Sequence, residues 1–163
     1  MRLFVYVSPE GDLYEKDGAE FEAAADELLN STVFAAAYFK QGFSWIEFFF
    51  LWSYTSSLES DWHADVHEDA KIPSVYARQA AIWMLLVGRE IFAYCQNNHG
   101  RRKPNTNHHV FALWRGDQGY SLERWTLWKK RFSELAQMNE EDARTKDMAS
   151  KALAEMEKIE NED

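Results

Sequence analysis

The chain of 163 residues has little of what marks several common classes of protein. Its single cysteine, Cys95, cannot form an internal disulfide, and its apolar surroundings predict a buried structural thiol. Three prolines and seven glycines leave little material for linkers, so we expect one domain over residues 1–163. The most apolar run, Phe43–Trp52, is interrupted by Glu47 and is too short for about 30 Å of hydrocarbon, so we expect no membrane partner.

Basic residues are also too few to favour nucleic acid as a partner. The chain has 18 Lys and Arg against 27 Asp and Glu, which gives a net charge of -9. This charge repels phosphate groups and anionic membranes, so we expect no nucleic-acid partner. The first residues lack the apolar core of a signal peptide, and we therefore expect the protein in the cytoplasm or the nucleus.

The familiar catalytic motifs are missing as well. The sequence contains no GxSxG, HExxH, CxxC, GxGxxG or GxxxxGK[ST] motif, which removes the well-marked enzyme classes and leaves no cofactor to predict. His63 and His67 would share one face of a helical turn, but two histidines make only half of a metal site. For Glu59–Asp69, which holds both, we expect an exposed acidic connection instead of a metal site.

The sequence does contain one helix that is apolar on nearly every side, at Pro73–Gln96, and such a helix belongs in a core. Further apolar positions recur at helical spacing in four regions: 19–39, 44–58 behind the capping box Ser44–Glu47, and the segments after Ser121 and Asn139. Residues 19–39 form one helix or two, because the polar residues 30–32 could break it. Phe48 and Leu122 are among the apolar residues that we expect to be buried. A turn at residues 8–12 suggests that residues 1–18 form a small hairpin or an extended N-terminal segment. We predict an all-α fold, a compact bundle of about five to seven helices around the buried helix Pro73–Gln96.

Three stretches carry a resemblance to a known family. They are Ala80–Trp83 followed by Gly88–Phe92, Ser121–Trp125 followed by Trp128, Lys129, Arg131 and Phe132, and the pair Ala152 and Met156. In these residues the chain resembles a family of filamentous-fungal proteins known only as a domain of unknown function, over about Leu51–Glu160. The first forty residues show no such likeness. The resemblance implies a mostly helical intracellular protein and brings no activity, cofactor or catalytic residue.

The few charges on the central helix point to a candidate site. Arg78 and Arg89 are about three turns apart and so lie on nearly the same side. If that side reaches solvent, these are ordinary surface ions; if it is buried, they must be paired, and an aromatic pocket with a charged anchor becomes a binding site. The candidate ligand-binding residues are Arg78, Trp83, Arg89, Glu90, Tyr94 and Trp125.

Two local features have simpler explanations. Arg101, Arg102 and Lys103 form a basic spot that could hold an anion, but they follow the end of a helix, where cations compensate the macrodipole. Cys95 and His99 are four residues apart and could pair as thiolate and base, yet the apolar surroundings of Cys95 favour a neutral thiol.

Two hypotheses of function follow. Aromatic residues make up 15% of the chain and the final helix has a mixed-charge face, which favours a non-catalytic interaction module that binds a protein partner or associates with itself. The alternative is a small enzyme or binder that acts on a small apolar ligand in an aromatic-lined pocket between helices.

Overall fold

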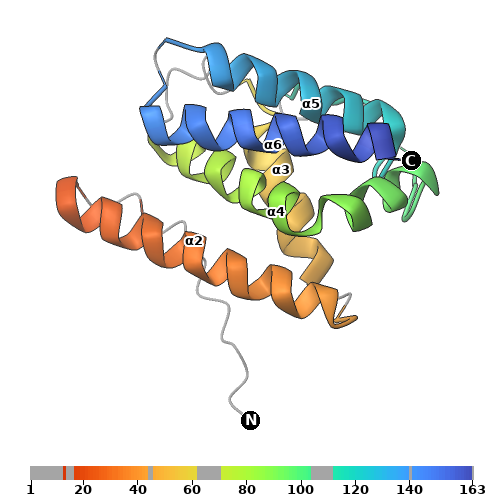
Figure 1. Ribbon diagram of the computed structural model, residues 1–163, viewed down its shortest axis with the longest axis horizontal. Coiled ribbons are helices and arrows are strands. Elements are labelled where there is room, and N and C mark those ends of the chain that lie inside the picture. Colours follow the sequence, from red (N-terminus) through yellow and green to blue (C-terminus); the bar gives the residue numbers. More distant parts are fainter. Residues whose placement is uncertain are drawn as a thin grey trace.

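The computed structural model describes residues 13, 17–43, 46–61, 71–103, 112–139 and 141–162, and these fold into five helices. The helices are α2 (Gly18–Lys40), α3 (Glu47–Ser57), α4 (Lys71–Gln96), α5 (Leu122–Gln137) and α6 (Ala143–Glu162) (Figure 1). The described part of the chain has no strand, only the isolated bridges Ser60 to Ala112 and Arg102 to Gln118. The prediction of an all-α fold is confirmed.

The predicted hairpin lies almost wholly outside the residues that the structure describes. Of its residues, Leu13 alone is described, and it has helical backbone geometry. At the one residue of the segment that the structure describes, it therefore gives no support to the hairpin. None of the described helices is long and apolar enough to cross a membrane.

Helix α4 is the centre of the bundle, as its sequence predicts. It packs against α2, α3, α5 and α6, and every residue from Ile72 to Ala81 is buried. Figure 1 shows α2 on one side of α4 and α6 and α5 on the other. The helix bends at Val87, whose φ of -134° and ψ of 23° are not helical. At the bend, Gly88 lets α6 come close, because a Cβ there would lie 2.8 Å from Ile159 Cδ1.

Aromatic rings fill the space between α3, α4 and α5. Phe50 contacts Tyr54, Trp83 and Trp128 with ring centroids 4.3 to 5.9 Å apart. The buried Tyr54 hydroxyl donates to the carbonyl of Ala80 at 3.0 Å, so this polar group is satisfied inside the core. A second, smaller cluster joins the first half of α2 to the start of α4 and comprises Leu13, Phe21, Ala25, Leu28, Ile72, Val75 and Tyr76.

Helix α2 is continuous, although Asn30, Ser31 and Thr32 suggested a break. The hydroxyls of Ser31 and Thr32 donate to the carbonyl of Leu28 at 2.7 and 2.9 Å. Hydroxyl side chains that bond back to the preceding turn are compatible with helix. Of the two predicted alternatives for residues 19–39, the single helix is therefore the one observed.

The other helix starts agree with the sequence to different degrees. The Ser121 hydroxyl accepts the amide of Arg124 at 3.2 Å and caps α5 as predicted. Helix α6 starts at Ala143, later than the predicted Asn139, because the Asp142 carboxylate accepts the amides of Arg144 and Thr145, both at 2.9 Å. Helix α3 starts at Glu47, and the predicted cap Ser44 lies outside the described residues.

Two residues predicted to be buried face solvent. Phe48 is 63% exposed and Leu122 is 47% exposed. The buried face of α3 runs instead through Phe50, Ser53, Tyr54 and Ser57. The hydroxyls of both serines donate to backbone carbonyls one turn earlier, so small polar residues can share this face with Tyr54. The prediction for Phe48 was wrong because the apolar residues of α3 exceed what one face can bury.

Candidate functional site

The structure distributes the six predicted ligand-binding residues over three places. Arg78 is 4% exposed, and its Nη1 and Nη2 lie 3.9 Å from Glu22 and 3.7 Å from Asp142, so it is buried and paired between α2 and the start of α6. Arg89 is exposed and pairs with Glu162 at the other end of α6. Both arginines therefore face α6, as their spacing predicts, but at opposite ends of that helix.

The aromatic candidates are divided in the same way. Trp83 and Trp125 are 1% and 2% exposed and belong to the core. Trp125 packs on Phe92 and donates its Nε1 to Glu160 at 2.8 Å, near the end of α6. Trp83 and Tyr94 lie in a different place from Trp125, where both contact Phe39 of α2.

Tyr94 is the most accessible of these aromatic side chains. Its ring stacks on His99 at 4.2 Å. Burial raises the pKa of Tyr94, and the negative charges of Glu47 and Glu90 raise it further. Of the six candidates, Glu90 and Tyr94 therefore interact electrostatically. The phenol of Tyr94 is therefore neutral at physiological pH.

Of the residues predicted for metal or thiol chemistry, the structure describes only Cys95 and His99. His63 and His67 lie outside the described residues, and within the described ranges no three potential metal ligands come together. Cys95 is fully buried, and burial raises the pKa of its thiol to about 12. His99 instead directs its Nε2 to the Glu47 carboxylate at 3.3 Å.

Glu59 is buried, so the prediction of an exposed connection over Glu59–Asp69 was wrong at its first residue. Its side chain and that of Arg124 are each 5% exposed. Arg124 donates Nε and Nη2 to the two Glu59 oxygens at 2.8 and 2.7 Å, and Trp128 donates Nε1 to the same carboxylate at 2.7 Å. Arg124 also donates to the carbonyl of Gly119. One buried pair thus joins the end of α3 to α5 and to the segment before it.

The sequence alone indicates that Arg124 is buried, although it does not identify its partner. Arg124 is four residues before Trp128 and seven before Arg131, so it lies on the buried face of α5. A buried guanidinium requires an acid partner. The sequence does not say which carboxylate supplies it, because Glu59 is 65 residues away.

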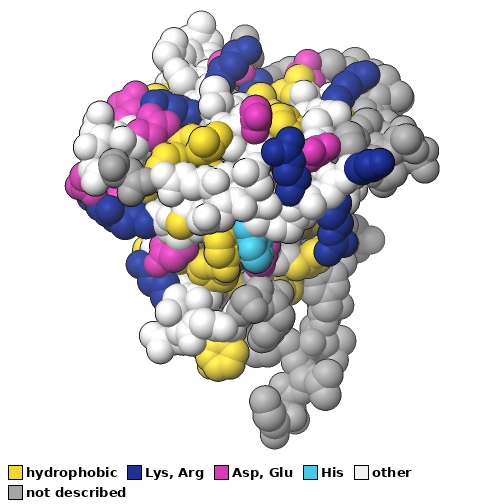
Figure 2. Space-filling model, turned by 90° about the vertical axis from the view of Figure 1, so that its right-hand side faces the viewer, with side chains coloured by type: hydrophobic (Ala, Val, Ile, Leu, Met, Phe, Trp, Pro, Cys, Tyr) yellow, Lys and Arg dark blue, Asp and Glu magenta, His cyan; other side chains and the backbone are white. Residues whose placement is uncertain are grey.

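An apolar surface remains uncovered on the second half of α2. We call it the α2 surface and define it by Val33, Phe34, Ala37, Tyr38 and Phe43. Phe34 is 53% and Phe43 is 46% exposed. The Tyr38 ring touches both, with centroids 4.6 Å from Phe34 and 5.4 Å from Phe43. Figure 2 looks at the end of the bundle where α2 and α4 end and shows hydrophobic side chains between charges of both signs.

The opposite side of the same helix is already used by the core. Leu28, Ala36 and Phe39 of α2 pack toward α4 and its neighbours. The second half of α2 is therefore apolar on both sides, which is the pattern of a helix with neighbours on both sides. Within the described residues, only one of the two sides has its neighbour.

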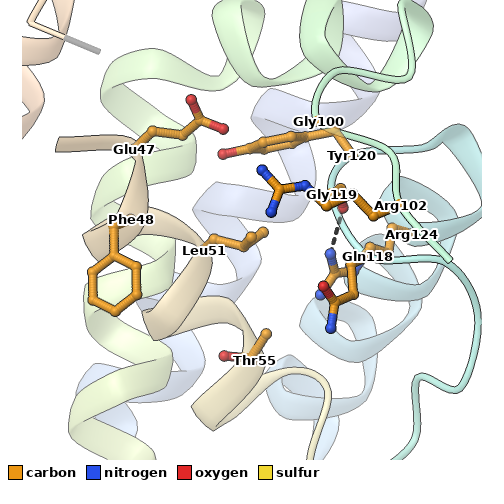
Figure 3. Close-up of a pocket in the computed structure, with 10 residues that line it drawn as sticks. All are labelled: Glu47, Phe48, Leu51, Thr55, Gly100, Arg102, Gln118, Gly119, Tyr120 and Arg124. Carbon is orange, nitrogen blue, oxygen red and sulfur yellow. Dashed lines mark hydrogen bonds between the residues drawn. The ribbon is translucent and has the colours of Figure 1, made fainter. Parts of the chain in front are cut away.

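A cleft of about 620 Å³ opens between α3 and the segments at the end of α4 and the start of α5 (Figure 3). One wall is α3, and the other is a pair of short segments held by the reciprocal backbone bonds between Arg102 and Gln118, at 3.1 and 2.9 Å. The residues that line the cleft are Glu47, Phe48, Leu51, Thr55, Gly100, Arg102, Gln118, Gly119, Tyr120 and Arg124.

Residues 3–132 match the model of a family described as a protein of unknown function, DUF3632. The chain belongs to the DUF3632 family. No curated protein and no solved structure matches it. The DUF3632 match begins at residue 3, so the expected start near Leu51 and the absence of family likeness in the first forty residues were wrong. The match covers α2, α3, α4 and the cleft residues and ends within α5, before α6.

Proposed function

We propose that this DUF3632 protein is a non-catalytic helical interaction module that binds another protein through the α2 surface. The observation that carries the proposal is the group of exposed rings of Phe34, Tyr38 and Phe43, which touch one another at 4.6 and 5.4 Å. Contiguous exposed aromatics on a soluble domain mark interaction sites, and such residues dominate the binding energy of interfaces.

The charge of the chain favours a partner of a particular kind. With a net charge of -9, two copies of the chain repel each other. The first half of α2, next to the α2 surface, also exposes the carboxylates of Glu20 and Glu27. We therefore expect a partner that presents an apolar face with basic residues beside it, such as an amphipathic helix.

The alternative, an enzyme or binder with an aromatic pocket built from Trp83, Tyr94 and Trp125, finds less support. Trp83 and Trp125 pack in the core, at 1% and 2% exposure. The cleft is lined by other residues, with Tyr120 as its one buried aromatic ring. The exposed rings of α2 have no comparable structural use, and an interaction surface accounts for them directly.

Site-specific photocross-linking tests the proposal. p-Benzoylphenylalanine replaces Ala37, which is exposed within the α2 surface, and, as the matched control, Ala154, which is exposed on α6. The labelled chains are irradiated in the cells that produce the protein, and adducts are identified by mass spectrometry. We expect a discrete protein adduct from position 37 that is absent from position 154. This adduct should be lost in the double variant Phe34→Ser, Tyr38→Ser. Equal adducts from both positions, or none, would contradict the proposal.

A further inference from the structure

We propose that the cleft between α3 and Arg102 binds a small molecule that carries one carboxylate on an apolar body. This inference goes beyond the proposed interaction with a protein and uses a different part of the molecule. It rests on the charges at the cleft, on the apolar residues of its α3 wall, and on the rigid backbone that forms its other wall.

Arg102 supplies the group that would hold the carboxylate. Its guanidinium reaches into the cleft from the segment after α4 and ends between Leu51 and Tyr120 (Figure 3). It forms no ion pair within 4.0 Å among the described residues, whereas Arg124 is bound by Glu59 and neighbouring Arg101 by Asp117 at 2.7 Å. The planar guanidinium group matches the geometry of a carboxylate.

The remaining polar groups limit the charge of the ligand. The Glu47 carboxylate lines the same cleft, with His99 3.3 Å away, and the Tyr120 hydroxyl faces it (Figure 3). Gln118 adds an amide donor on the side of Arg102. Glu47 repels a ligand with two or more negative charges, such as a phosphate ester, more strongly than a ligand with a single carboxylate, which can bind Arg102 at the other wall.

The α3 wall would take the apolar body. Phe48, Leu51 and Thr55 are spaced at three and four residues, so they form one stripe on the helix and line the cleft together. Phe48 is 63% exposed, so most of its side chain is available for contact with a ligand. A volume of about 620 Å³ lies within the roughly 300–1,000 Å³ typical of small-molecule sites.

The opposite wall is held in place before any ligand arrives. Gly119 has a φ of +86°, and a Cβ there would lie 2.5 Å from the carbonyl carbon of Gly100 and 2.7 Å from the amide nitrogen of Arg101. The two segments can therefore touch only because residue 119 has no side chain. The buried Arg124 also holds this wall in place by donating a hydrogen bond to the Gly119 carbonyl. A site that is organised in advance loses less free energy on binding.

Titration with octanoate, followed by amide NMR shifts of the full chain, tests the inference. 1-Octanol serves as the probe with the same apolar body and no charge. Arg102→Gln removes the proposed anchor, and Lys103→Gln is the matched control, because it removes the same charge from the next residue, which does not line the cleft. Circular dichroism of each variant confirms that it is folded.

We expect octanoate to shift the amides of cleft residues such as Leu51 and Gln118, and to bind at least about tenfold more tightly than 1-octanol. Arg102→Gln should weaken octanoate binding by about tenfold or more and leave 1-octanol unchanged, while Lys103→Gln should change neither. Octanoate binding that is absent at millimolar concentration, or equal in Arg102→Gln and the wild type, would overturn the inference. Phe34→Ser and Tyr38→Ser should leave octanoate binding intact, so the two proposals can fail separately.

Discussion

The substitution Arg124→Leu leaves the Glu59 carboxylate buried without its cation. Glu59 is 5% exposed and would keep the Trp128 Nε1 at 2.7 Å as its one remaining donor among those described, while the carbonyl of Gly119 would lose its donor. Removing one partner of a buried pair typically lowers the free energy of unfolding by about 3–5 kcal/mol. Because domains are stable by roughly 5–15 kcal/mol, we expect a loss of about a fifth or more of the free energy of unfolding.

Urea denaturation followed by circular dichroism measures this loss. Arg89→Leu is the control, because it removes an arginine from an exposed pair with Glu162, which should change stability by less than about 1 kcal/mol. The double variant Glu59→Leu, Arg124→Leu should be more stable than Arg124→Leu alone, since no unpaired charge remains in the core. A loss below about 1 kcal/mol for Arg124→Leu, or strictly additive losses in the double variant, would refute the reasoning.

Three further predictions concern single residues. Burial opposes ionisation of Asp142, but hydrogen bonds from Thr145 and Arg144 and the charge of Arg78 together outweigh it and lower the pKa of Asp142. Asp142→Ala should therefore lower the free energy of unfolding, measured by urea denaturation at neutral pH, by about 1 kcal/mol or more, and the difference should shrink as acidification protonates the wild-type carboxyl. The Cys95 thiol, with its pKa raised to about 12 by burial, should react with a thiol reagent at pH 8 only in urea, and rapid reaction in native buffer would contradict the assignment. Gly119→Ala should lower the midpoint of urea denaturation more than Gly42→Ala, because both have positive φ but only Gly119 touches backbone, and equal midpoints would count against the close contact.

Much of the helical framework could be predicted from the sequence because it depends on local spacing. The all-round apolar character of Pro73–Gln96 identified the central helix, and Ser121 identified the start of α5. The start of α6 was misplaced because Asn139 and Asp142 are both good caps, and only the geometry shows that Asp142 accepts the amides.

The features on which the proposals and the buried ion pair rest depend on contacts between distant residues. Helical spacing does not reveal which of the aromatic residues of α3 face outward, so Phe48 was assigned to the core. Glu59 looked like part of a solvated acidic segment, although its partner Arg124 is 65 residues away. Arg102 was recognised as part of a basic spot, but its place in a cleft depends on the bridge to Gln118, which no local pattern predicts.

The affinity of the partner for the α2 surface tests the central claim most directly. Once cross-linking from position 37 has identified the partner, its dissociation constant is measured by calorimetry for the wild type, for Phe34→Ser with Tyr38→Ser, and for Leu122→Ser. Leu122 is the control because it is an apolar residue on α5 that is 47% exposed. We predict that loss of the two rings weakens binding by about a hundredfold or more, and that Leu122→Ser changes it less than about threefold. The same affinity for all three proteins would contradict the claim that α2 carries the interaction.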